Sequence, residues 1–486
     1  MRGAPERVPE STSGARRPAR PRLRPRPAHS LPALLAALAA LLLSCLAAAC
    51  GPGRAGAPES AQERPFRVAV GQDLTASGVR QELIREAARD AGARQVEIVE
   101  LPDDTDRQRG QLVAALQGGD RAGYDLVVLD VTWTAEFAEL GLIEPLTGDL
   151  DVQRAKQYAD VWPAVRETVR HDGRSWGVPW NTDVGLLFYR ADLLDADPAL
   201  RTWQGLTRVV HGQRPGHGLS AGMITQLMTY EGLTVNAHEA VWRDGGDLVD
   251  AAGRVRAGES RARQGLGELR AGFTAPPGRL PMFDGGSLVS DETASVERFL
   301  AGEALTMRNW PFARFPLEEH LKKVRDGTAY GVTALPAGDP DGDGTGPETG
   351  GPAVLGGQNL AVAAGTPNGA LAREVIRRLT SKDMAGRLYA KGFVPAHRDA
   401  VGAGGCDAGS GSWSLPERPP QEPSLAAQYH EALCWSMEHA RARPATPYYA
   451  AVTRDIQEVT AQGLAEEAGM DTGELQRRLE RSLRGE

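Results

Sequence analysis

The stretch WGVPWNTDVGLLFYRADLL, residues 176–194, decides how the chain is organised. Two apolar runs flank the polar insert Asn181-Thr182-Asp183, and the second run is rich in strand-forming residues. A nearly continuous apolar run suits a strand that is covered on both faces. Polar residues inside a buried crossing need partners, so we expect the insert to offer an amide and a carboxylate to a small polar ligand between two lobes. The alternative is an ordinary core strand after a polar loop. A helix could begin at Asp192.

Length and charge set the limits of the interpretation. A chain of 486 residues exceeds what one compact core holds, so two lobes are expected. The whole chain carries a net charge of -8, and residues 1–49 contain eight arginines and two glutamates, which leaves the rest near -14. An acidic body argues against nucleic acid as a partner.

The N-terminus is a targeting segment and does not belong to the fold. Its arginines precede a short apolar stretch, and Ala47-Ala48-Ala49 then lead to Cys50. This order resembles a bacterial lipoprotein signal peptide over residues 1–49, with Cys50 acylated and 50–63 as a flexible tether. The chain would then be extracytoplasmic and lipid-anchored to the outer face of the bacterial cell membrane. Cys45 is a second possible acceptor, and a plain cleaved secretory signal is the alternative.

Two cysteines remain, Cys406 and Cys434. Outside the cytoplasm such a pair indicates a disulfide, and two free thiols are the alternative. The spacing of cysteines and histidines does not match a zinc site. We therefore expect neither a metal nor a cofactor.

Residues 64–130 alternate between strand and helix patterns. Strands are predicted at 67–70, 96–101 and 124–129, and helices at 79–91 and 107–116. The alternation predicts a βαβ arrangement and a mainly parallel sheet. Ligands bind beyond the carboxyl ends of such strands, where Asp130 lies. Its carboxylate either accepts hydrogen bonds from ligand hydroxyls or caps a helix that begins at Thr134.

Five sequence blocks carry a family resemblance. They are LDVTWTAEFAELGLIEPL (129–146), VPWNTDVGLLFYRADLL (178–194), FLAGEALTMRNWPFA (299–313), LGGQNLAV (355–362) and RPATPYYAAVTRDIQ (443–457). In this order they look like the extracellular solute-binding proteins of carbohydrate ABC importers, most of all the trehalose/maltose-type lipoproteins.

The resemblance implies an α/β, two-lobed periplasmic-binding-protein-like fold with three hinge crossings, near 178–185, 354–360 and 393–397. The amino-terminal lobe would hold 64–180 and 355–397, and the carboxy-terminal lobe 184–350 and 398–486. The residues that would line the sugar site are Asp130, Asn181, Glu292, Trp310, Gly356, Gly357 and Arg443.

These residue types suit a sugar. Trp310 offers a flat face to apolar C–H groups, Asp130 and Glu292 accept hydrogen bonds from hydroxyls, and Asn181 and Arg443 donate them. The alternatives are a core aromatic at Trp310 and a structural ion pair at Arg443. Glu231 is a further candidate, for which a structural or rim role is favoured.

The resemblance implies a monomeric receptor that binds an oligosaccharide, such as trehalose or maltose, and delivers it to ABC transporter permease subunits. No enzyme is expected, and no residue is assigned as catalytic, because H-E-x-x-H and Walker motifs are missing from the sequence. The alternatives are a receptor for a non-sugar ligand and a secreted glycosidase that uses Asp130 and Glu292.

Three features depart from the family. Gln358 stands where members often have an aromatic residue, and residues 203–222 match poorly. The acidic run from Asp339 begins like a calcium loop but has Gly350 where the loop needs a glutamate, so we predict an acidic surface loop.

Overall fold

The computed structural model describes residues 64–73, 75, 77–102, 104–118, 123–194, 198–216, 218–339, 350–402, 404–406, 425–466 and 469–486. All of them belong to one compact unit, Ser60–Glu486. The predicted signal peptide, the tether, Cys45, Cys50 and most of the acidic run after Asp339 lie outside the described residues. Among the helices that are described, none is both long and apolar enough to cross a membrane.

A six-stranded sheet has the strand order β12–β6–β11–β3–β1–β2. Its strands are β1 (Phe66–Val70), β2 (Val96–Glu100), β3 (Leu126–Asp130), β6 (Val178–Val184), β11 (Leu355–Val362) and β12 (Val394–Pro395). The first three strands pair in parallel, whereas β11, β6 and β12 join antiparallel. The prediction of a mainly parallel sheet is therefore wrong for the sheet as a whole. The βαβ pattern covers only the first three strands, and the other three return from distant parts of the chain.

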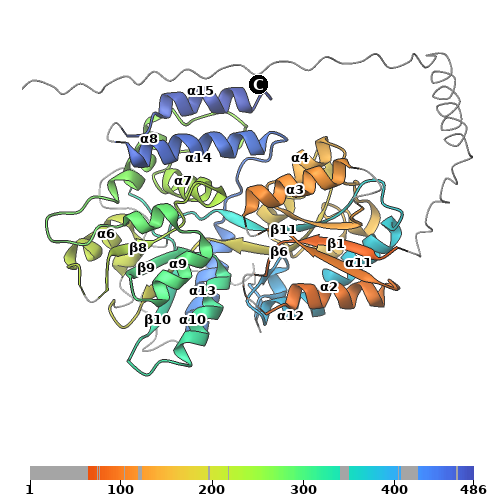
Figure 1. Cartoon of the computed structure of the whole chain (residues 1–486), viewed down its shortest axis with the longest axis horizontal. Helices are drawn as coiled ribbons and strands as arrows, with labels where there is room; N and C mark the ends of the chain where they lie inside the picture. Colours follow the sequence, from red (N-terminus) through yellow and green to blue (C-terminus); the bar gives the residue numbers. More distant parts are fainter. Residues whose placement is uncertain are drawn as a thin grey trace, which may run out of the picture. The chain divides into compact units, whose positions relative to one another are not determined.

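Alternating side chains of β1 build two helical layers. Val68 and Val70 pack in one buried cluster with α2 (Val79–Asp90) and α11 (Gly369–Leu379). Ala69 points the other way, into a cluster with α3 (Thr105–Gln117) and α4 (Thr134–Glu139). Figure 1 shows these helices on opposite sides of β1. The period of two along the strand thus gives a sheet that is covered on both faces.

A second sheet has four strands in the order β10–β7–β9–β8. They are β7 (Leu186–Arg190), β8 (Ala221–Ile224), β9 (Ala304–Asn309) and β10 (Tyr330–Ala334). The helices that contact this sheet are α6 (Trp203–Gly212), α9 (Glu292–Leu300) and α13 (Leu425–Glu438). A separate buried cluster joins α7 (Glu231–Arg243), α8 (Ser260–Ala271), α14 (Tyr449–Ala465) and α15 (Thr472–Ser482). The segment that matched the family poorly thus contains α6 and the start of β8.

The remaining elements are short. They are α5 (Pro163–Glu167), α10 (Arg314–Leu321), α12 (Lys382–Tyr389), the two-stranded sheet of β4 (Arg170–His171) and β5 (Arg174–Ser175), and the 3-10 turns η2 (Gly148–Leu150), η3 (Lys156–Tyr158), η4 (Pro198–Arg201), η5 (Gly285–Val289), η6 (Pro311–Ala313) and η7 (Arg398–Ala400).

The stretch 176–194 joins the two sheets. Gly185 separates β6, in the six-stranded sheet, from β7, in the four-stranded sheet. The chain returns between β10 and β11, and β11 lies beside β6 (Figure 1). The helix expected at Asp192 is not formed there, because residues 191–194 make a turn in which Asp192 binds the Arg190 side chain at 2.8 and 2.5 Å. Residues 195–197 lie outside the described residues.

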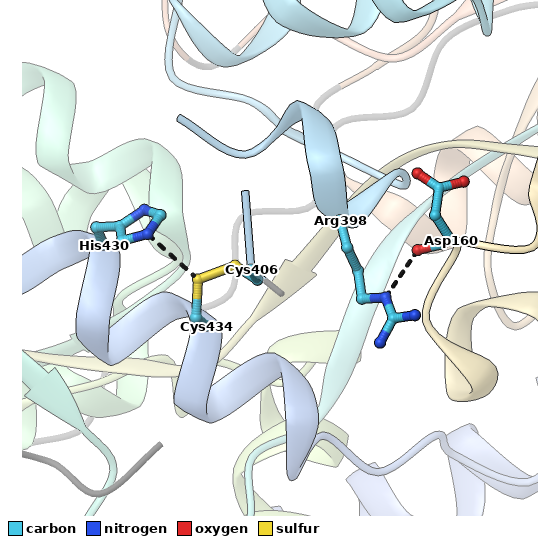
Figure 2. The surroundings of a disulfide bond; sticks show 5 residues. All are labelled: Asp160, Arg398, Cys406, His430 and Cys434. Atoms are coloured by element: carbon cyan, nitrogen blue, oxygen red, sulfur yellow. Dashed lines mark hydrogen bonds between the residues drawn. A yellow bond between two sulfur atoms is a disulfide. The ribbon is translucent and has the colours of Figure 1, made fainter. Parts of the chain in front are cut away.

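A disulfide joins Cys406 to Cys434, the pairing that the sequence predicts. The two Cα atoms lie 5.5 Å apart, within the normal range for such a bond. Cys434 belongs to α13, and Figure 2 shows that His430, one turn earlier, points toward its sulfur. A ring nitrogen of His430 lies 3.8 Å from that sulfur. Near Cys406, the Arg398 side chain donates to the Asp160 carbonyl at 2.9 Å. The bond therefore ties the segment that follows β12 to a helix of the four-stranded sheet.

Candidate functional site

A cavity is lined by residues of β3, β6 and β11 and by residues of α7, α9 and the segment that follows β9. The residues that line it include all seven predicted site residues, Asp130, Asn181, Glu292, Trp310, Gly356, Gly357 and Arg443. Others that line it include Arg80, Asp183, Glu231, Gln358 and Phe393. The fold thus brings together residues that lie far apart in the sequence.

Strand pairing sets one polar row of this cavity. Gln358 on β11 lies opposite Asp130 on β3 and opposite Asn181 on β6. The three side chains therefore share one line across the sheet. The Asn181 Oδ1 and Gln358 Oε1 atoms are buried and have no hydrogen-bond partner among the described residues.

Asp130 does not cap a helix. Its Oδ1 atom accepts hydrogen bonds from the backbone N and the Oγ1 of Thr132, at 2.9 and 2.7 Å. The N-cap residue of α4 is Trp133, which makes no side-chain capping bond. The capping alternative is wrong because the chain turns once more before the helix begins. A role for Asp130 in ligand binding stays a prediction.

Two glycines let the cavity wall approach its neighbours closely. Gly357 has a φ of +118°, and a Cβ there would lie 2.5 Å from the Asn181 carbonyl oxygen. A Cβ on Gly356 would lie 3.2 Å from the Trp310 indole. A side chain at either position would push the β11 backbone away from Trp310 or from β6.

Trp310 and Glu292 line the cavity from the side of the four-stranded sheet, on the segment after β9 and at the start of α9. Trp310 directly follows β9, and its indole N–H donates to Glu292 Oε1 at 3.2 Å. The other carboxylate oxygen of Glu292 accepts from the Tyr230 hydroxyl at 2.7 Å. Trp310 is partly buried against the core and also lines the cavity, so the core-aromatic alternative describes only part of its surroundings.

Arg443 forms the ion pair that the sequence left as an alternative. Its Nη1 atom pairs with the buried Glu231, which also accepts from Tyr449 and from Thr453. Its Nη2 atom lies 3.8 Å from Asp130 Oδ1. Burial raises the pKa of Glu231, although the charge of Arg443 opposes that rise. Arg443 thus connects Glu231 to the end of β3, and the structural or rim role favoured for Glu231 stays a prediction, since Glu231 also lines the cavity.

The site residues implied by the family resemblance do not include Asp183 or Arg80, although the polar insert itself predicted a carboxylate at Asp183 for the ligand. Desolvation raises the pKa of Asp183 to about 7, a rise that the Arg80 charge opposes. Arg80 is buried, and its guanidinium lies over the rings of Trp180 and Phe393. The signal for Asp183 was the polar insert in the crossing strand. The sequence signal for Arg80 was weaker: it is a charged residue near the apolar face of a predicted helix.

The titration of Asp183 predicts a pH-dependent stability. The pKa of an aspartate in the unfolded chain is about 3.9, so between this value and about 7 the folded state binds more protons than the unfolded state. The contribution of Asp183 to stability should therefore fall as the pH rises from about 4 to about 7 and then level off. Asp183→Asn removes this pH-dependent contribution. The urea midpoint of the variant, relative to that of the wild type, should therefore be higher at pH 8 than at pH 5.

Asp192→Asn is the control for this measurement. Desolvation acts to raise the pKa of Asp192, but the bonded Arg190 holds it below its ordinary value. The carboxylate is then ionised in both states from pH 5 to pH 8, and the difference from the wild type should stay constant. An equally constant difference for Asp183→Asn would contradict the prediction.

The cavity lies beside β6 and β11, the strands that lead into and out of the four-stranded sheet. This arrangement defines a two-lobed α/β ligand-binding protein. The chain belongs to the bacterial extracellular solute-binding proteins, because the family model with that description matches residues 82–405. The predicted family and the predicted two-lobed fold are both confirmed. The family is extracellular, which places the chain outside the cytoplasm.

Individual proteins that are similar in sequence or structure agree with this family assignment. The chain is 30% identical over 299 residues to a "Probable ABC transporter-binding protein" of Deinococcus radiodurans, covering 59% of this chain and 64% of that protein. It resembles maltose-bound MalE3 of T. maritima, with a TM-score of 0.68, 26% identity, and 86% and 99% of the two chains covered. The GacH receptor of Streptomyces glaucescens, solved unliganded and with acarbose, is 18% identical with a TM-score of 0.66 over 86% and 98% of the chains, and it supports the fold alone.

Proposed function

We propose that the chain is a membrane-anchored receptor that binds a sugar in this cavity, a disaccharide such as maltose or trehalose, and delivers it to an ABC permease. The observation that carries the proposal is the wall composition of the cavity. Two tryptophans, Trp133 and Trp310, line it together with a polar row that contains Asp130 and Asn181. A sugar has apolar C–H faces and a polar rim, and this cavity offers partners for both.

The mechanism we propose is closure without chemistry. Residues 64–180 with 355–397 would form one lobe, and 184–350 with 398–486 the other. A ligand that contacts both lobes favours the state in which they are close, and that state docks on the permease. The receptor would act as a monomer. The T. maritima relative was solved with maltose bound, which supports the choice of a glucoside.

A glycosidase that uses Asp130 and Glu292 is the second candidate, and the structure offers little support for that pair of carboxylates. Retaining and inverting enzymes need one carboxyl group that is free to protonate the leaving oxygen. Both oxygens of Glu292 already accept hydrogen bonds, from Trp310 and Tyr230. The family to which the chain belongs is described as one of solute-binding proteins.

Calorimetry tests the proposed function. The mature chain is titrated with trehalose, maltose, sucrose and larger glucosides, and at least one should bind with about micromolar affinity, near -8 kcal/mol. Chromatography of the recovered ligand should show unchanged sugar. If no sugar in the panel gives heat or shifts the melting temperature, the assignment fails.

The lipid anchor has a separate test. Cys50→Ser should release the chain from the membrane fraction of producing cells, because no acyl chain can then be attached at that position. Cys45→Ser is the matched control, and it should stay membrane-bound. The reverse pattern would assign the anchor to Cys45, and release of neither variant would remove the lipoprotein interpretation.

A further inference from the structure

Arg308 joins three groups beside the cavity and is itself only 2% exposed. Its Nε and Nη2 atoms donate to the two carboxylate oxygens of Glu239, at 2.9 and 2.7 Å, and Nη1 donates to Gln226 at 3.3 Å. Its guanidinium carbon lies 4.0 Å from the ring centre of Trp310. One face of the indole is therefore occupied by a cation, and a ligand in the cavity can stack only on the other face.

Glu239 carries this contact to the segments between the sheets. Its Oε1 atom accepts the backbone N–H of Val354 at 3.1 Å, directly before β11 begins. At Gly185, between β6 and β7, an added Cβ would lie 2.5 Å from Glu239 Oε1 and 2.9 Å from Arg308 Nη2. The first and the second passage of the chain between the sheets therefore both meet the same ion pair.

A buried, bidentate ion pair resists gradual deformation. Its hydrogen bonds are charge-assisted and directional, and separating the charges leaves each one buried without a partner. A rotation at Gly185 or a displacement of Val354 must therefore move Glu239, and with it the guanidinium that packs on Trp310. Coupled elements of this kind switch between discrete arrangements.

We propose that Arg308 is a positioning residue that holds the Trp310 indole at the cavity and links ligand contact there to the two passages between the sheets. The proposal rests on the proposed function, because it assumes a ligand that stacks on Trp310. A purely structural ion pair would stabilise the fold without linking these two regions, so the test needs readouts other than stability.

The first readout needs no sugar. Hydrogen exchange is measured on the mature chain for the amides of residues 184–186 and 354–357. Arg308→Met should speed exchange there at least tenfold relative to a core strand such as β1. Arg308→Lys should restore part of the protection, because lysine keeps the positive charge but cannot make the bidentate hydrogen bonds of the guanidinium. Arg314→Met is the matched control, since Arg314 also packs on an aromatic ring, that of Tyr429 at 4.7 Å, away from the cavity.

The second readout uses maltose as the probe. Arg308→Met should weaken maltose binding at least tenfold and reduce the decrease in radius of gyration that saturating maltose causes, whereas Arg314→Met should change neither. Wild-type affinity and compaction in a folded Arg308→Met variant would overturn the proposal, and so would unchanged exchange at 184–186 and 354–357.

The design separates the two proposals. If the wild type binds no sugar, the proposed function fails, and the exchange data still decide whether Arg308 links Trp310 to the passages. If the wild type binds maltose but Arg308→Met behaves like it, only the present inference fails. If Arg308→Met does not fold, the same exchange and binding measurements are made on Arg308→Lys and Glu239→Gln, because both variants keep the side-chain volume close to that of the wild type.

Discussion

Replacing Arg443 with methionine should destabilise the folded chain by about 3–5 kcal/mol, the usual cost of removing one partner from a buried ion pair. Arg443 is 6% exposed and Glu231 is 7% exposed, so the ion pair is largely shielded from water in the wild type. Glu231 would keep the donors Tyr449 and Thr453 but would lose its only charged partner among the described residues. The measurement is the free energy of unfolding in urea.

The control for Arg443 is an arginine on the surface. Arg478 pairs with Glu474 at 2.9 Å and with Glu458 at 2.7 Å, but its side chain is 30% exposed. Arg478→Met should therefore cost less than about 1 kcal/mol. A second variant, Arg443→Met with Glu231→Gln, removes the buried charge and should recover much of the loss. Arg443→Met would contradict the prediction if its cost were no greater than that of Arg478→Met.

The local elements of the fold could be predicted from the sequence. The helix predicted at 79–91 is α2, and the strands predicted at 67–70 and 96–101 are β1 and β2, each within one or two residues. Hydrophobic periodicity is a local property, so it reports these elements without knowledge of their partners. The same reasoning failed at Asp192, where the bonds to Arg190 and to the Ala329 amide stabilise a turn instead.

The arrangement of the site could not be predicted in the same way. Gln358 reaches Asp130 and Asn181 because β11 lies between β3 and β6, and strand register over such sequence distances leaves no periodic signal. The family resemblance supplied the seven residues. It did not supply Arg80, whose position on the apolar side of α2 is explained only when Asp183 is seen beside it. Side chains that come into contact only in the folded chain therefore could not be paired from the sequence alone.

Trp310→Ala should weaken sugar binding by about 2–4 kcal/mol, the range for an aromatic anchor at the centre of a binding site. The loss has two sources. The ligand loses a flat apolar surface, and Glu292 Oε1 loses the indole N–H that donates to it at 3.2 Å. Calorimetry with the tightest-binding sugar of the panel measures the loss, and circular dichroism checks that the variant folds.

Two variants separate these sources. Trp310→Phe keeps an aromatic face but loses the N–H, so it should bind more tightly than Trp310→Ala and more weakly than the wild type. Trp176→Ala removes an indole that donates to the His171 carbonyl at 3.0 Å and does not line the cavity, so affinity should stay unchanged. If Trp310→Phe binds as weakly as Trp310→Ala, the hydrogen bond to Glu292 dominates. If Trp310→Ala binds like the wild type, the sugar does not stack on this ring, and other residues that line the cavity, such as Trp133 and the polar row, account for the affinity.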